Sequence, residues 1–301
     1  MSPLNNAIKV SVIIPCYNDG KYIQEAIDSV NAQTFKNFEI IVVDDGSTDS
    51  ETQTILSKIK QDNLQVLFLK QNQGLPIARN RGIELAKGQY ILPLDADDKI
   101  APTYIEKACK VLDEDKDIGI VYCEAELFGE TNCKWELAEF SLSQILIGNM
   151  IFATAMYRKT HWEKVNGYNK NMIHGYEDYD FWLSLLELDI KVYCIPEILF
   201  FYRQKKTSMV KKLEKDEEIK LAIWLQLFKN HKKLYTENIE IIYTWMRKQE
   251  KQIQTKDQKI QEKNKLLQKK DQEIQHLHNI IQSMRIRNRV KSIIRYFFFK
   301  T

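Results

Sequence analysis

Carboxylates gather at three places in the 301-residue chain, and the spacing at each place could support chemistry. Residues 95–98 read Asp-Ala-Asp-Asp, and acids this close repel one another unless a cation lies among them. Such oxygen ligands suit Mg²⁺ or Mn²⁺, which takes one or two carboxylates and completes its coordination with substrate phosphate. The alternative is a turn that caps a helix beginning near Pro102. The Asp-x-Asp pattern alone leaves both interpretations open.

The second acidic segment, residues 44–49, reads Asp-Asp-Gly-Ser-Thr-Asp and could bind a nucleoside. A carboxylate there can accept hydrogen bonds from the N–H of uracil or from ribose hydroxyls. A turn followed by a helix cap would use the same residues equally well. Neither acidic segment is therefore decisive alone.

The third acidic pair, Glu177 and Asp178, falls in the first turn of an expected helix. Apolar residues at 181, 182, 185, 186 and 188 predict that this helix begins near Tyr176. The acids could simply complement the helix dipole. They could instead supply a general base, with Gly175 giving the backbone the freedom to enter a cleft.

Alternating strands and helices must position these acids. Over the first hundred residues, short apolar runs alternate with stretches of helical period. Strands are predicted at 9–15, 39–43, 65–69 and 90–94, and helices at 21–33, 50–60 and 75–86. This alternation predicts a parallel sheet covered on both sides. Ligands of such sheets bind at the carboxyl ends of the strands, so we expect segments 44–49 and 95–98 to share one edge.

The composition excludes several classes of protein. With 44% hydrophobic and 28% charged residues the chain can bury a core, so it is not a protein that is disordered over its whole length. No apolar run approaches the roughly 18 residues of a spanning helix, and residues 1–7 do not resemble a cleaved signal. The glycines form neither G-x-G nor a phosphate loop. The five cysteines form no C-x-x-C pair, which is typical of reduced, mostly buried thiols in a cytosolic protein.

The C-terminal part differs in charge and pattern. Residues 246–301 carry 15 Lys/Arg and 5 Asp/Glu, so a basic tail follows an acidic body. From Met246 to Ile281 one apolar residue recurs every seven, although Gln or Lys fills most of the other core positions. This predicts a weak coiled coil over 246–284 that could form a homo-oligomer, with a single solvated helix as the alternative.

The last segment, residues 285–301, mixes basic and apolar residues. Such a composition suits an anionic membrane surface, and the alternative is a helix whose apolar side packs on the body. We expect no nucleic acid partner, because no nucleic-acid-binding motif accompanies the basic residues.

Five motifs occur in an order that resembles a known family. They are VSVIIPCYN (10–18), VVDDGSTD (42–49), QNQGLPIARNRGI (71–83), YILPLDADD (90–98) and GYEDYDFWL (175–183). Over residues 8–205 the chain resembles inverting family 2 glycosyltransferases of the GT-A fold. The resemblance implies a Rossmann-like, mostly parallel α/β sheet with helices on both faces, followed by a helical C-terminal extension. The expected divisions are 1–210 for the transferase domain, 211–245 for a helical extension, 246–284 for the coil and 285–301 for the tail.

The resemblance also implies roles for individual residues. Asp178 matches the catalytic base, with Glu177 supporting it or orienting the acceptor. Asp95 and Asp97 match the D-x-D pair, and Asp97 is the expected ligand of Mn²⁺ or Mg²⁺, although Asp98 leaves the register open by one. Expected contacts of the nucleotide-sugar are Pro15, Tyr17 (near the uracil), Asn18, Asp44, Asp45, Asn72 and Arg79.

Two positions depart from the family pattern. Lys205, in the segment 202–208, stands where relatives often carry a His that helps to bind metal or diphosphate. A charged Lys cannot ligate a metal, but it can pair with phosphate as a point charge. Ser184 stands where many relatives have Arg, so contacts with the acceptor could differ.

Taken together, the sequence predicts a metal-dependent transfer of a hexose or N-acetylhexosamine from a UDP-sugar to a hydroxyl. The expected acceptor is a glycan or lipid-linked precursor of a bacterial surface polysaccharide, reached from the cytoplasm at the inner face of the cell membrane. One alternative is a nucleotidyltransferase acting on a sugar phosphate, but the Gly-rich phosphate loop that such enzymes need is absent. The other is a non-catalytic coiled-coil interaction protein, against which the intact acidic motifs argue.

Overall fold

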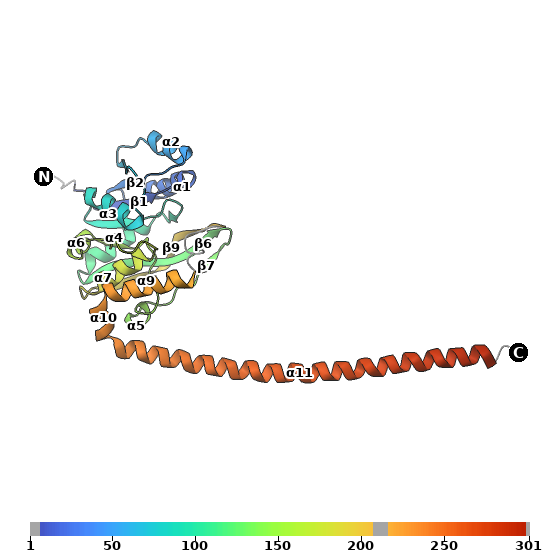
Figure 1. The fold of residues 1–301 in the computed structure, drawn as a ribbon. Helices are drawn as coiled ribbons and strands as arrows, with labels where there is room; N and C mark the ends of the chain where they lie inside the picture. Colours follow the sequence, from blue (N-terminus) through green and yellow to red (C-terminus); the bar gives the residue numbers. More distant parts are fainter. Residues whose placement is uncertain (1–6, 207–215, 299–301) are drawn as a thin grey trace. The chain divides into compact units, whose positions relative to one another are not determined.

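The computed structural model describes residues 7–206 and 216–298, with side chains as far as residue 296. The chain divides into two compact units, Met1–Ile239 and Glu240–Thr301. Figure 1 shows a sheet with helices in the first unit and one long helix in the second. Of the segments singled out in the sequence, residues 207–208 and 299–301 lie outside the described residues.

Strands β1 to β4 form the parallel half of a mixed sheet, in the order β3-β2-β1-β4. β1 carries the β-branched run Val12-Ile13-Ile14, all fully buried, because a strand inside a parallel sheet is covered on both faces. The bounds are β1 (Val10–Cys16), α1 (Gly20–Asn31), β2 (Phe38–Asp44), α2 (Ser50–Lys58), β3 (Leu64–Phe68), α3 (Leu75–Leu85) and β4 (Tyr90–Pro93). The predicted parallel sheet is therefore confirmed.

Helix α3 packs unusually close to the sheet. A Cβ added at Gly82 would lie 2.6 Å from Cγ2 of Ile13 and 3.0 Å from Cγ2 of Val43. Any larger side chain would push the helix away from β1 and β2. Because α3 also carries Arg79, this close approach sets the height of Arg79 above the sheet edge.

The second half of the sheet is mixed. β8 pairs antiparallel with β4 and with β6, whereas β6 and β9 pair in parallel, and β5 and β7 run antiparallel to β9 and β6. The bounds are β5 (Lys99–Ile100), α4 (Tyr104–Glu114), β6 (Ile118–Gly129), β7 (Cys133–Trp135), α5 (Leu142–Ile145), β8 (Met156–Arg158), α6 (Lys159–Lys164), α7 (Glu177–Leu186) and β9 (Lys191–Gln204). The reversed strand β8 thus joins two parallel sets into one sheet.

Two helices, α9 (Glu217–Asn230) and α10 (Lys232–Glu237), complete the first unit. The ring of Trp224 on α9 meets the ring of Tyr179 on α7 with centroids 5.9 Å apart. His231, between α9 and α10, is buried with Nε2 3.1 Å from Asp180 and Nδ1 3.1 Å from Glu187. These contacts fix both helices to α7, which carries the predicted catalytic base.

Helix α11 (Ile239–Phe298) runs without a break through the predicted coil and into the predicted tail. Among its described side chains, the apolar heptad positions are exposed, for example Ile260 at 55% and Ile274 at 62%. Within the described residues, no helix has the length and apolar character that crossing a membrane requires. The oligomeric coil and the membrane-binding tail both stay predictions.

Candidate active site

Three loops meet at the carboxyl edge of the parallel strands. Cys16 at the end of β1 lies in register with Asp44 at the end of β2, and the N–H of Asp45 donates to the carbonyl of Cys16 over 2.9 Å. β4 lies on the other side of β1 and leads into residues 95–98. The two acidic segments therefore flank the loop 17–19, as the expected sharing of one sheet edge requires.

A cavity of about 650 Å³ opens between the β1, β2 and β3 loops. Tyr17 lies at its wall with 42% of its surface exposed, and Asn72 lies there too. The other lining residues are Asp44, Gly46, Ser47, Thr48, Gln53, Phe68, Leu69, Lys70 and Gln71. An exposed aromatic ring among amide and hydroxyl groups suits a planar, hydrogen-bonding ligand such as a nucleobase.

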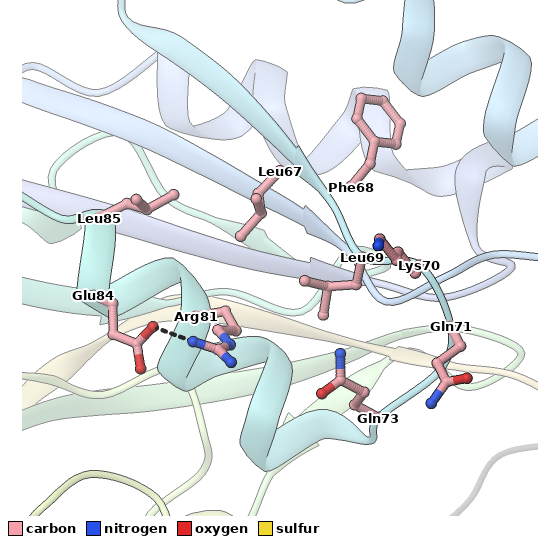
Figure 2. Close-up of a pocket in the computed structure, with 9 residues that line it drawn as sticks. All are labelled: Leu67, Phe68, Leu69, Lys70, Gln71, Gln73, Arg81, Glu84 and Leu85. Carbon is pink, nitrogen blue, oxygen red and sulfur yellow. Dashed lines mark hydrogen bonds and ion pairs between the residues drawn. The ribbon is translucent and has the colours of Figure 1, made fainter.

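A second cavity of about 650 Å³ lies beside it, between β3 and α3 (Figure 2). Phe68 to Gln71 line both cavities, whereas Arg81 and Glu84, which are 2.9 Å apart, line only the second one. None of the predicted site residues lines this second cavity. We therefore place the candidate nucleoside site in the first.

Asp44 and Asp45 are both buried and bind backbone amides. Asp45 accepts from the N–H of Gln73 over 2.8 Å and from that of Gly74 over 2.9 Å, so it fixes the loop before α3. Burial raises the pKa of Asp45, while those two amides oppose the rise. Asp44 accepts from the N–H of Ser47 over 3.0 Å, so it closes a turn. Both acids shape the cavity wall through the backbone.

Asn18 and Pro15 also act on the protein itself. Asn18 has a φ of +55°, and its side-chain oxygen accepts from the N–H of Thr48 over 2.8 Å and from that of Asp49 over 3.1 Å. Asn18 therefore clips the β1 loop to the β2 loop. Pro15 is buried inside β1, opposite Val43. Of the predicted nucleotide contacts, Tyr17, Asp44 and Asn72 line the cavity.

Arg79 joins the sheet edge to helix α7. Its side chain is 1% exposed, and its guanidinium lies 2.8 Å from the carboxylate of Asp95 and 2.5 Å from that of Glu177. Burial lowers the pKa of Arg79, but Asp95 and Glu177 raise it well above its ordinary value, so the group stays charged. Arg79 thus binds one acid from each of two motifs that lie about 80 residues apart in the sequence.

Asp178 follows Glu177 in the first turn of α7. The helix begins after two residues with positive φ, Gly175 at +106° and Tyr176 at +60°, which turn the chain sharply into the site. The Asp178 carboxylate accepts from its neighbour, the N–H of Tyr179, over 2.8 Å and from the side-chain amide of Asn149 over 3.1 Å. No motif in the sequence marks Asn149.

Burial and the charge of Glu177 raise the pKa of Asp178 to about 7, although Arg79 and the N–H of Tyr179 oppose the rise. A carboxylate with a pKa near neutrality is well suited to accept a proton from a hydroxyl, because it is both available and basic enough.

The D-x-D segment meets a lysine and an arginine from the end of β9. Lys205 Nζ lies 2.7 Å from the carboxylate of Asp97, and the side chain of Arg203 donates to the Asp97 carbonyl over 2.7 Å. Asp98 is buried and accepts from the N–H of Arg203 over 2.8 Å. Asp95 and Asp97 are the members of the segment whose carboxylates face cationic side chains.

The carboxylates of the D-x-D segment suit a divalent cation only if further ligands, such as phosphate oxygens, complete its coordination. Within the described ranges, no three His, Cys, Asp or Glu side chains converge tightly enough to hold a metal ion. Asp95 and Asp97 nevertheless offer hard oxygen atoms, and burial together with nearby carboxylates raises the pKa of Asp97 despite Lys205. Mg²⁺ and Mn²⁺ commonly take one or two carboxylates and complete the shell with phosphate and water, so these residues fit such an ion in the presence of a diphosphate.

The chain is similar to known proteins over much of its length. Residues 11–173 match the family described as glycosyl transferase family 2. An uncharacterized glycosyltransferase of Rickettsia typhi is 34% identical over 232 residues, which cover 71% of this chain and 70% of the relative. Glycosyltransferase GlyG of Streptococcus pneumoniae is 30% identical over 220 residues, which cover 67% of this chain and 73% of GlyG.

Solved structures show the same fold. The crystal structure of S. aureus TarS 1–349 in complex with UDP-GlcNAc matches this chain with a TM-score of 0.59. The match covers 77% of this chain and 73% of the TarS chain. The sequences are 22% identical, so the likeness concerns the fold alone. It confirms the GT-A fold that the ordered motifs predicted.

Proposed function

Because the chain belongs to glycosyl transferase family 2, we propose that it is an inverting glycosyltransferase that moves a hexose or N-acetylhexosamine from a UDP-sugar to an acceptor hydroxyl. The observation that carries this proposal is the Arg79 bridge, which ties Asp95 at the sheet edge to Glu177 beside Asp178. The bridge connects the sheet edge that we propose to bind the diphosphate with the helix start that carries the proposed base, and this connection supports the assignment. The complex of TarS with UDP-GlcNAc supports a UDP-sugar as donor.

The donor would lie along the sheet edge. Its uracil fits the cavity lined by Tyr17 and Asn72, whose shape depends on the amide contacts of Asp45. Its diphosphate would extend toward Asp97 and Lys205, where the ammonium can pair with phosphate oxygens. A divalent cation held by Asp97 and Asp95 would neutralise the charge that develops on the leaving diphosphate.

Asp178 would act as the base of the transfer. Its carboxylate takes the proton of the acceptor hydroxyl, the hydroxyl oxygen forms a bond to the anomeric carbon, and the bond to UDP breaks with its electron pair on the diphosphate. Attack opposite the leaving group inverts the anomeric centre. Asn149 and the N–H of Tyr179 orient the carboxylate, and Glu177 supports it through Arg79 and through its charge.

Replacement of the base tests the proposal. Asp178→Asn keeps the size of the side chain, so UDP binding should persist while transfer falls by about 10²- to 10⁴-fold, the usual contribution of a general base. Asp189→Asn makes the same change at an exposed position and should leave transfer at the wild-type rate. The readout is UDP release when a panel of UDP-sugars is mixed with candidate glycan acceptors and Mn²⁺. Undiminished turnover by Asp178→Asn would remove this residue from the base role.

We further propose that the acceptor is a glycan or a lipid-linked precursor of a bacterial surface polysaccharide. The basic and apolar residues of 285–301 support contact with an anionic membrane, which would hold the enzyme on the inner, cytoplasmic face of the cell membrane. Ile286 and Ile293 are 61% and 57% exposed, as such contact requires. The exposed heptad residues over 246–284 support a homo-oligomeric coil.

A further inference from the structure

Lys205 holds the carboxylates at the D-x-D edge from the β9 side. Its Nζ lies 2.7 Å from Asp97 and 3.0 and 3.2 Å from the two oxygens of Asp19, which belongs to the β1 loop. The side chains of Lys205 and Asp97 are only 22% and 17% exposed. The ring of Tyr22 lies 5.0 Å from the ammonium, so the cation has an aromatic face on one side and two acids on others.

This ammonium is a fixed charge. A lysine side chain is ordinarily protonated near neutral pH, and the carboxylates of Asp97 and Asp19 both lie within ion-pair distance of it. The strand end that carries Lys205 is itself held, because Arg203 donates to the Asp97 carbonyl and to the Asp98 carboxylate. Without another anion in the site, Lys205 therefore stays paired with Asp97 and Asp19.

A divalent ion on Asp97 would therefore meet a cation already bound to the same carboxylate. Two cations within a few ångströms repel strongly in a half-buried site. Asp97 and Asp19 carry two negative charges against the three positive charges of Lys205 and a divalent ion, and Asp95 is already paired with Arg79. The diphosphate of a nucleotide changes the balance, because it offers Lys205 a new anionic partner and offers the metal further oxygen ligands.

We infer that Lys205 keeps Asp97 closed to divalent metal until a nucleotide diphosphate binds, so that metal and nucleotide enter the site together. This inference rests on the proposed function, because it places the donor diphosphate at this edge. Binding couplings are reciprocal, so Mn²⁺ should raise the affinity for UDP by the same factor by which UDP raises the affinity for Mn²⁺.

Mn²⁺ binding to the full chain, followed by the electron paramagnetic resonance signal of free Mn²⁺, tests the inference with and without UDP. Wild type should bind Mn²⁺ appreciably only with UDP. Lys205→Gln should bind it without UDP at least about tenfold more tightly than wild type does, because the repelling charge is gone. Lys205→Arg keeps the charge, and Lys206→Gln removes one from the exposed neighbouring residue, so both should behave as wild type.

Equal Mn²⁺ affinity of wild type and Lys205→Gln without UDP would overturn the inference. Absence of Mn²⁺ binding from every variant, even with UDP, would overturn it as well. Calorimetry of UDP in the same samples separates the two proposals. UDP binding by wild type in either of those cases leaves the proposed transferase intact, whereas absence of UDP binding throughout would overturn both.

Discussion

Arg79→Met removes the positive charge that pairs with Asp95 and Glu177 and changes the side-chain volume little. It leaves Glu177, 6% exposed in its side chain, as a buried carboxylate without its cation, whereas Asp95 at 31% can gain water. Removing one partner of a buried ion pair costs about 3–5 kcal/mol, and the exposure of Asp95 favours the lower end, about 3 kcal/mol. For a unit of this size each kcal/mol shifts the unfolding midpoint by about 2–4 °C, so we expect a loss of about 6–12 °C.

A double-mutant cycle shows whether the lost stability comes from the uncompensated charge. Glu177→Gln removes that charge, so Arg79→Met/Glu177→Gln should be more stable than the sum of the single losses predicts, by at least about 1 kcal/mol. Arg81→Met is the matched control, since its ion pair with Glu84 is about half exposed on both sides and should contribute less than about 1 kcal/mol. Urea unfolding followed by near-ultraviolet circular dichroism measures all four variants. Equal losses from Arg79→Met and Arg81→Met, or strict additivity in the cycle, would refute the reasoning.

Three further outcomes are expected. The rate of transfer should rise with pH through about 7, because the deprotonated form of Asp178 is the proposed proton acceptor and burial, together with Glu177, raises its pKa to about 7; a flat profile from pH 5 to 9 would contradict this. Burial lowers the pKa of His231, but Asp180 and Glu187 raise it above its ordinary value on balance. The charged form therefore stabilises the fold at low pH, and this stabilisation is lost as the pH rises through the raised pKa. The difference in thermal unfolding midpoint between wild type and His231→Gln should therefore become smaller above neutral pH. A difference that stays constant with pH would contradict this. Deletion of 285–301 should release the protein from anionic vesicles and spare transfer to a soluble acceptor, so unchanged partitioning would remove the membrane proposal.

The strands and helices of the parallel half were predictable because they depend on local pattern. The run Val12-Ile13-Ile14 is apolar on both faces, and only a strand covered on both sides buries all of it. The placement of segments 44–49 and 95–98 followed from the rule for carboxyl ends of parallel strands. The mixed half was less accessible, because the pairing of β8 with both β4 and β6 joins segments far apart in the chain, which no local pattern specifies.

Within the site, the sequence indicated the acids but not their partners. Which carboxylate receives Arg79 depends on the height of α3, and hence on the close approach at Gly82. The contact of Asn149 with Asp178 and that of Asp19 with Lys205 are tertiary pairings with no motif of their own. The sequence also could not tell which acids of residues 95–98 have a backbone partner. In the structure Asp98 accepts from the N–H of Arg203, which is a tertiary contact without a motif.

The two adjacent acids at the start of α7 have different surroundings: Glu177 pairs with Arg79, and Asp178 has a raised pKa. Glu177 pairs with Arg79, which fixes the helix start to the sheet edge. Burial and the charge of Glu177 raise the pKa of Asp178, so Asp178 is a stronger base than an isolated, solvated carboxylate. If Glu177 were neutral, the positive field of Arg79 would act on Asp178 with less opposition and lower its pKa. Glu177→Gln should therefore shift the pH dependence of transfer to lower pH, and a shift to higher pH would show that Glu177 acts in another way.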